Sequence, residues 1–140
     1  MAASPIDTYR LQVQRALQAG NATEHTHRPA LEALLKALSK DSVVTNEPKR
    51  IAVGAPDFVI RRKIGKEQFL PVGYVETKDI GANLNDIEKS DQIKRYLTLD
   101  NLILTNYTEF RWYVGGKRRL IETLPPLRGG TKGGKATAEV

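Results

Sequence analysis

The chain has 140 residues, of which 40% are hydrophobic and 27% are charged, a balance typical of one folded domain with its own hydrophobic core. It contains no cysteine, which excludes disulfide bonds and thiolate metal sites and fits a cytoplasmic location. No apolar run approaches the roughly 18 residues of a transmembrane helix, and the N-terminus lacks the apolar centre of a signal peptide. We therefore expect no membrane partner.

Two helices are expected near the N-terminus. Residues 5–19 carry apolar side chains at helical spacing, and Gly20 ends that pattern. A second helix should begin near Arg28 with Pro29 in its first turn, because apolar residues then repeat at intervals of three and four. Thr23 is a candidate N-cap for it.

Strand-like patterns dominate after the second helix. Residues 57–62 and 71–78 are joined by a turn around Gly65, so they should form an antiparallel hairpin. A helix over residues 86–99 leads to a further strand, which can pair in parallel after this crossover. The expected strands are 42–45, 57–62, 71–78, 101–105 and 110–114.

This order of elements predicts an α/β fold with an αβββαβ core, in which a small mixed sheet is flanked by helices. We place an N-terminal helix in residues 1–22 and the main domain in residues 23–122. Residues 123–140 are interpreted as a flexible, basic, glycine-rich tail or linker. Trp112 and Phe110 are expected in the core rather than on a base-stacking platform.

The net charge of +6 lies mostly at the C-terminal end. From Lys117 onward there are six basic and two acidic residues, so this end carries +4 and residues 1–116 carry only +2. A basic end of this kind is usually solvated, although it can also hold phosphate backbones without sequence preference. Charge alone therefore does not indicate DNA.

The chemistry lies in the predicted hairpin. Asp57 opens its first strand after Pro56, and Glu76 and Lys78 end its second. Because side chains alternate along a strand, Glu76 and Lys78 point the same way, and pairing can bring Asp57 beside Glu76. Two carboxylates and an ammonium group at one place suit a hard divalent cation such as Mg²⁺ and a water molecule to be activated.

A Glu-x-Lys triplet alone is a weak signal, because an exposed cross-strand charge pair is the more common explanation. The chain contains a second such triplet, Glu47-Pro48-Lys49. There the proline interrupts the strand and no apolar run precedes it, so we expect it to have no role. The Pro-Asp pair upstream and the strands on both sides favour the functional interpretation for Glu76 and Lys78.

Polar residues on the predicted helices are further candidates. Gln92 and Tyr96 lie four residues apart, on one face of the helix that follows the Glu-x-Lys strand. Glu24 precedes the second helix, where an acid is equally explained by the helix dipole. His25 and His27 are interpreted as polar residues of the helix start, since two histidines without a third ligand make no zinc site.

The pattern Asp57-x18-Glu76-Thr77-Lys78 followed by Gln92-x3-Tyr96 resembles the PD-(D/E)xK nuclease superfamily, in particular its branch with a Gln-x3-Tyr motif. Type I restriction motor subunits and recombination helicase–nucleases belong to that branch. Over residues 20–116 the chain also looks like the N-terminal nuclease segment of large single-chain restriction–modification enzymes. The stretches that carry this likeness are TEHTHRP (23–29), NEP (46–48), GAPDF (54–58), EKSDQIKRY (88–96), NLILT (101–105) and FRWY (110–113).

The resemblance implies a restriction-endonuclease-like fold and hydrolysis of DNA phosphodiester bonds by an endonuclease module of a restriction–modification system. It implies that Asp57 and Glu76 hold Mg²⁺, or Mn²⁺ in its place, with the Thr77 carbonyl as a third ligand. Lys78 would orient or help to deprotonate the attacking water and offset charge on the phosphorane.

The resemblance also assigns supporting roles and partners. Gln92 and Tyr96 would position the site or touch the DNA backbone, and Glu24 would hold a water on the metal. Those relatives continue into motor or adenine-methyltransferase domains, whereas this chain contains no Gly-x4-Gly-Lys-[Ser/Thr] loop and has no room for a methyltransferase. Such domains would then be partners on the same or another chain.

Three functional interpretations remain. The first is a Mg²⁺-dependent DNA endonuclease, and the second is a nuclease-like module that binds DNA or a partner without cleaving. The third is a fragment of a larger restriction enzyme and adenine DNA methyltransferase that is inactive without its motor. The intact set of Asp57, Glu76 and Lys78 favours the first, because a purely structural fold needs no such cluster.

Overall fold

A computed structural model describes residues 4–20, 22–23, 25–46 and 48–125. The chain falls into two compact units. One holds the two N-terminal helices, and the other runs from Ser39 to Thr123. The domain boundaries expected from the sequence stay predictions, and the expected tail lies almost wholly outside the described residues.

The helical unit contains α1 (Pro5–Ala19) and α2 (Arg28–Leu38). Both match the sequence prediction, and the Ser4 hydroxyl caps α1 by accepting a hydrogen bond from the Asp7 backbone N–H at 3.1 Å. The N-cap prediction for Thr23 is wrong, because α2 begins five residues later and the Thr23 backbone N–H instead donates to the Thr26 hydroxyl at 2.6 Å. No helix in the described part of the chain is long and apolar enough to cross a membrane.

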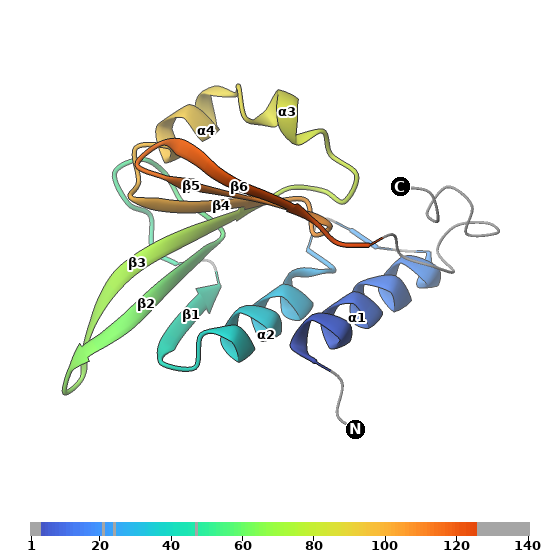
Figure 1. The fold of residues 1–140 in the computed structure, drawn as a ribbon, viewed down its shortest axis with the longest axis horizontal. Helices are drawn as coiled ribbons and strands as arrows, with labels where there is room; N and C mark the ends of the chain where they lie inside the picture. Colours follow the sequence, from blue (N-terminus) through green and yellow to red (C-terminus); the bar gives the residue numbers. More distant parts are fainter. Residues whose placement is uncertain (1–3, 21, 24, 47, 126–140) are drawn as a thin grey trace. The chain divides into compact units, whose positions relative to one another are not determined.

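The second unit is built on a six-stranded sheet whose spatial order follows the sequence (Figure 1). All neighbouring strands are antiparallel except β3 and β4, which are parallel. Two short helices, α3 and α4, form the crossover that this parallel pair requires. The elements are β1 (Ser42–Asn46), β2 (Phe58–Gly65), β3 (Gln68–Thr77), α3 (Leu84–Ile87), α4 (Asp91–Tyr96), β4 (Asn101–Thr105), β5 (Glu109–Val114) and β6 (Lys117–Thr123).

The predicted mixed α/β fold is therefore confirmed, with three differences in its elements. The hairpin extends further than expected toward its turn, and at the other end Asp57 and Lys78 lie just outside its strands. The expected helix over 86–99 is divided, because the Ser90 hydroxyl accepts from the Ile93 backbone N–H at 3.2 Å and thereby starts a second helix. The sequence prediction also missed β6 altogether.

Strand β6 lies where the basic C-terminal end begins. All seven of its residues are exposed, so it lacks the apolar alternation by which a strand is recognised. The signal that could have found it is the pair Gly115-Gly116, whose φ angles of 56° and 82° suit a two-residue hairpin turn. Its lysine and arginines are typical of an edge strand that must not pair with another chain.

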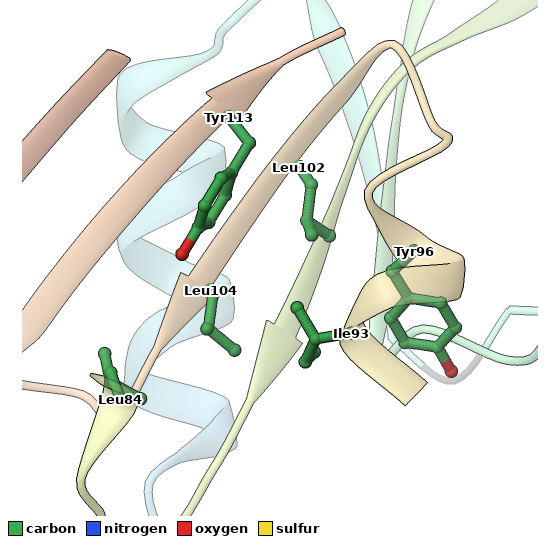
Figure 2. Packing of buried hydrophobic residues seen from close by; sticks show 6 residues of the cluster. All are labelled: Leu84, Ile93, Tyr96, Leu102, Leu104 and Tyr113. Atoms are coloured by element: carbon green, nitrogen blue, oxygen red, sulfur yellow. The ribbon is translucent and has the colours of Figure 1, made fainter. Parts of the chain in front are cut away.

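The core of this unit lies between the crossover helices and one face of the sheet (Figure 2). Ile93 and Tyr96 on α4 pack against Leu102 and Leu104 on β4, each at most 2% exposed. Burial of such side chains contributes about 1.5–3 kcal/mol each, which fixes α4 against the sheet. The core prediction for Trp112 is wrong: its side chain points from β5 to the other face and is 41% exposed.

Candidate active site

The hairpin register brings the predicted acids together. Phe58 pairs with Val75 in the last antiparallel pair, so the next position along each strand places Asp57 opposite Glu76. The Asp57 backbone N–H donates a hydrogen bond to Oε1 of Glu76 at 3.2 Å. Both residues therefore meet at the end of the hairpin where β2 begins and β3 ends.

Thr77 holds the carboxylate of Asp57. The backbone N–H and the hydroxyl of Thr77 both donate to Oδ2 of Asp57, each at 2.8 Å. Two hydrogen bonds to one oxygen fix the orientation of the carboxylate. The family resemblance implied only the Thr77 carbonyl as a metal ligand. Nothing in the motif indicates that the Thr77 hydroxyl orients the Asp57 carboxylate.

Lys78 connects the acids to the crossover helix. Its ammonium nitrogen lies 3.4 Å from Oε2 of Glu76 and donates to Oε1 of Gln92 at 2.7 Å. Its backbone N–H donates to the carbonyl of Thr105 at 2.8 Å, which ties Lys78 to the end of β4. The structure thus brings Gln92, Lys78 and Glu76 into one polar chain.

Tyr96 contacts the loop that leads to Asp57. Its hydroxyl points away from the hydrophobic core (Figure 2) and accepts a hydrogen bond from the Ala55 backbone N–H at 3.2 Å. Gly54 has a φ of 140°, and a Cβ atom there would lie 2.8 Å from the Tyr96 ring. Arg95 donates from Nε to the Val53 carbonyl at 3.3 Å. Helix α4 therefore sets the course of this loop.

Gly54 and Arg95 are residues whose roles sequence reasoning missed. The glycine could have been suspected, because it stands three residues before an acid that needs a defined approach. Arg95 carries no comparable signal, since an exposed arginine in the last turn of a helix is common.

The electrostatics of the site centre on Glu76. Burial and, after it, the charge of Asp57 raise the pKa of Glu76 to about 7, although the Lys78 ammonium and the Asp57 N–H act in the opposite direction. Burial and the charge of Glu76 also raise the pKa of the Tyr96 hydroxyl. The protein thus leaves the negative charge of Glu76 incompletely compensated.

The donor set fits a hard cation rather than zinc. Among residues 4–20, 22–23, 25–46 and 48–125, no three or more His, Cys, Asp or Glu side chains gather into a metal site. Mg²⁺ is commonly bound through one or two carboxylates and keeps several waters, whereas structural zinc takes four nitrogen or sulfur ligands. Asp57 and Glu76 can therefore hold Mg²⁺, which would offset the charge that burial disfavours on Glu76.

Two of the remaining candidates cannot be placed. Glu24 lies outside the described residues, and so does Glu47 of the second triplet, while Lys49 is exposed. His25 and His27 belong to the turn before α2, and burial lowers the pKa of His27. Their assigned roles stay predictions.

Comparison with known proteins supports the fold. The chain is similar to a solved structure described as a complex of DrdV with DNA, determined by cryo-electron microscopy. The TM-score is 0.71 at 16% sequence identity, and the match covers 85% of this chain but only 12% of the other. No protein-family model matches the sequence, and no curated protein matches it.

Proposed function

We propose that this chain is a Mg²⁺-dependent DNA endonuclease module of a restriction–modification system. The observation that carries the proposal is the buried Glu76, which lies beside Asp57 and Lys78 with its charge incompletely compensated. A carboxylate with a strongly raised pKa in such a cluster is typical of a functional site. A fold that needed the hairpin only for stability would gain more from an apolar residue at this position.

Each residue has a role that follows from its contacts. Asp57 and Glu76 would hold the cation, with the Thr77 N–H and hydroxyl keeping the Asp57 carboxylate in place. Lys78 would orient the attacking water and offset the charge that develops on the phosphate in the transition state. Gln92 would keep the Lys78 ammonium from turning into solvent, since it accepts a hydrogen bond from it at 2.7 Å.

The cation would supply one kind of chemistry. When bound, Mg²⁺ lowers the pKa of water and neutralises charge on the phosphate oxygens. Tyr96 and Gly54 would act at a distance by fixing the loop before Asp57. The protein thereby keeps both carboxylates in place before the cation arrives, which reduces the reorganisation needed for reaction.

DNA as the substrate is supported by the fold. The similar structure is described as a DNA complex, and this chain spans about an eighth of that protein's length. We therefore propose that motor or methyltransferase domains, on the same or another chain, are partners of this module. The alternative is a nuclease-like module that binds DNA without cleaving it.

Incubation of the purified chain with supercoiled plasmid tests the proposal. We expect nicked and linear products with Mg²⁺ or Mn²⁺ and none with EDTA. Glu76→Gln should abolish cleavage, whereas Lys49→Ala, a substitution of the exposed lysine of the second triplet, should cleave like wild type. Binding of plasmid without any Mg²⁺-dependent cleavage would instead support the binding module.

A further inference from the structure

The far end of the β2–β3 hairpin projects from the sheet as a two-stranded ribbon (Figure 1). Strand β1 accompanies β2 only as far as the pair Ser42 and Arg62, and β4 accompanies β3 only from Tyr74 onward. Beyond Arg62, Lys63 pairs only with Phe69 and Gly65 only with Gln68, which makes the tip two-stranded. The six residues Gln68–Gly73 of β3 extend about 20 Å beyond β4 at the usual rise of a strand. We call residues 62–73 the ribbon.

The ribbon is basic, and the chain offers its cations little compensation. Arg62, Lys63 and Lys66 are exposed, and within the described part of the chain none of them forms an ion pair. The one acidic residue of the ribbon is Glu67, at the turn. Three positive charges on a narrow projection create a local attraction for a polyanion.

Large apolar side chains lie beside these charges. Phe69 is 42% exposed directly across from Lys63, and Leu70 is 52% exposed across from Arg62. An open groove at the base of the ribbon is lined by three basic residues and one acid beside Phe69, namely Lys40, Arg62, Lys63 and Asp41. A solvated loop gains nothing by exposing such side chains, but together with cations they suit the sugar and base edges of a nucleic acid.

The shape also indicates the form of the nucleic acid. The major groove of B-DNA is about 12 Å wide and admits a two-stranded β-ribbon. Single-stranded nucleic acid offers no such groove, so the shape of the ribbon favours a duplex. We propose that the ribbon is a DNA-gripping arm that enters a groove of duplex DNA, with Arg62, Lys63 and Lys66 on backbone phosphates. This inference rests on the proposed function, because the duplex held is the one that the site would cleave.

The arm acts away from the cleaved bond. Lys63 lies six positions after Asp57, or about 20 Å along β2. For DNA that follows the hairpin, this distance corresponds to about six base pairs at about 3.4 Å each. The arm would therefore raise affinity for DNA that continues beyond the cleavage position, and it would leave the chemical step unchanged.

Fluorescence anisotropy with a labelled 30-base-pair duplex in EDTA tests the arm without cleavage. The triple variant Arg62→Ala, Lys63→Ala, Lys66→Ala should bind about 10- to 100-fold more weakly than wild type. The slope of log affinity against log salt should also become shallower by about 0.9 for each phosphate that is no longer neutralised, or about 2–3 in all. Because all three residues are exposed, the melting temperature should not change.

A second triple variant removes the same charge elsewhere in this unit. Lys89→Ala, Lys117→Ala, Arg119→Ala changes exposed residues of the crossover and of β6. It should bind within about threefold of wild type. Equally weakened DNA binding in both triple variants would contradict the proposed arm, because the overall positive charge of the protein would then explain the binding. Unchanged DNA binding by the ribbon variant, or no DNA binding by wild type, would also contradict the proposed arm. Either result would favour a protein as the partner of the ribbon.

Cleavage assays separate this inference from the proposed function. With Mg²⁺, the ribbon variant should lose activity at low DNA concentration and regain it at saturating DNA, whereas Glu76→Gln should bind DNA in EDTA and never cleave. If wild type does not cleave but the ribbon variant still loses affinity, the arm stands and the nuclease proposal fails. If wild type cleaves and the ribbon variant binds normally, only the arm is overturned.

Discussion

Glu76 and Glu88 lie in the same unit, but the protein treats their charges in opposite ways. Burial and the neighbouring Asp57 raise the pKa of Glu76 to about 7, with a single lysine 3.4 Å away. Burial also raises the pKa of Glu88, but hydrogen bonds from Tyr113 and Arg118 and the arginine charges outweigh it, so the pKa is lowered overall. The Tyr113 hydroxyl lies 2.5 Å from Glu88, and the guanidinium groups of Arg118 and Arg111 lie 3.1 and 3.3 Å away.

This difference separates a carboxylate whose charge the protein compensates from one whose charge it leaves largely uncompensated. Glu88 joins α3, β5 and β6 through partners that the chain itself provides, so its charge stabilises the fold. Glu76 lacks such compensation, and its charge costs stability unless a cation arrives. Burial acts to raise the pKa of both acids, so burial alone does not distinguish them. The direction of the net pKa shift depends on the neighbouring charges and hydrogen bonds.

The largest effect is expected for catalysis at Lys78. Lys78→Ala should lower the cleavage rate by about 10²–10³-fold, because the charge opposite the phosphate in the transition state is removed. The melting temperature should change little, since the side chain is partly exposed. Rates are measured on supercoiled plasmid with Mg²⁺. Lys49→Ala serves as the matched lysine control, and an equal reduction there would show that Lys78 has no special place in the reaction.

The next effect concerns stability in EDTA at pH 8. Glu76→Gln should stabilise the protein by up to about 3 kcal/mol, the equivalent of a pKa raised from 4.5 to about 7. Glu88→Gln should destabilise it by about 1–3 kcal/mol, because Tyr113 and two arginines lose a charged partner. Urea unfolding measures the free energy of unfolding of each variant. A change of the same sign in both variants would contradict the difference between Glu76 and Glu88.

The pH dependence of wild type follows from the same shift. A carboxyl whose pKa is raised in the folded state binds its proton more tightly there than in the unfolded chain, so stability falls as pH rises. In EDTA the Glu76 contribution should fall between pH 4.5 and about 7 and then level off. Glu76→Gln should lack this component when unfolding free energies are compared over that range.

Metal binding should affect the two acids differently. A hundredfold excess of Mg²⁺ over its dissociation constant should stabilise wild type by about 2.7 kcal/mol, because the cation binds only the folded site. Glu76→Gln should lose this gain and Glu88→Gln should keep it. Melting temperatures at pH 8 over a Mg²⁺ series measure the effect. Equal gains in both variants would place the cation elsewhere.

A further effect is expected at the loop before Asp57. Gly54→Ala should cost about 1–3 kcal/mol, because a Cβ would lie 2.8 Å from the Tyr96 ring in a backbone conformation of positive φ. Gly81→Ala has the positive φ without any neighbour within 4 Å, so it isolates the backbone contribution. Cleavage should fall with Gly54→Ala and not with Gly81→Ala. Equal activity in the two would mean that the loop does not position Asp57.

The meeting of Asp57, Glu76 and Lys78 could be predicted because it depends on local rules. Alternation along one strand relates Glu76 to Lys78, and the pairing of a single hairpin places Asp57 opposite Glu76. The metal and catalytic roles of these residues stay predictions. The apolar pattern of the crossover predicts one helix where the structure has two, because a strong cap at Ser90 outweighs that pattern.

Other features depend on contacts that no local pattern encodes. The raised pKa of Glu76 depends first on its burial in the folded protein. The size of Trp112 favours the core, but an alternating strand places it on the face opposite Tyr113, which is buried. Strand β6 is polar throughout, so hydrophobic periodicity could not identify it.

The parallel pairing of β3 with β4 has a consequence for how the protein folds. Asp57 and Glu76 are neighbours in a hairpin, which forms within microseconds in small model systems. Gln92, Tyr96 and the Thr105 carbonyl reach the site only when the crossover closes and β4 pairs with β3, a slower step because distant parts of the chain must meet. A nascent or partly folded chain therefore carries both acids but lacks the contacts that hold Lys78 in place. The contacts of Lys78 would then be completed late in folding, after the two acids have met.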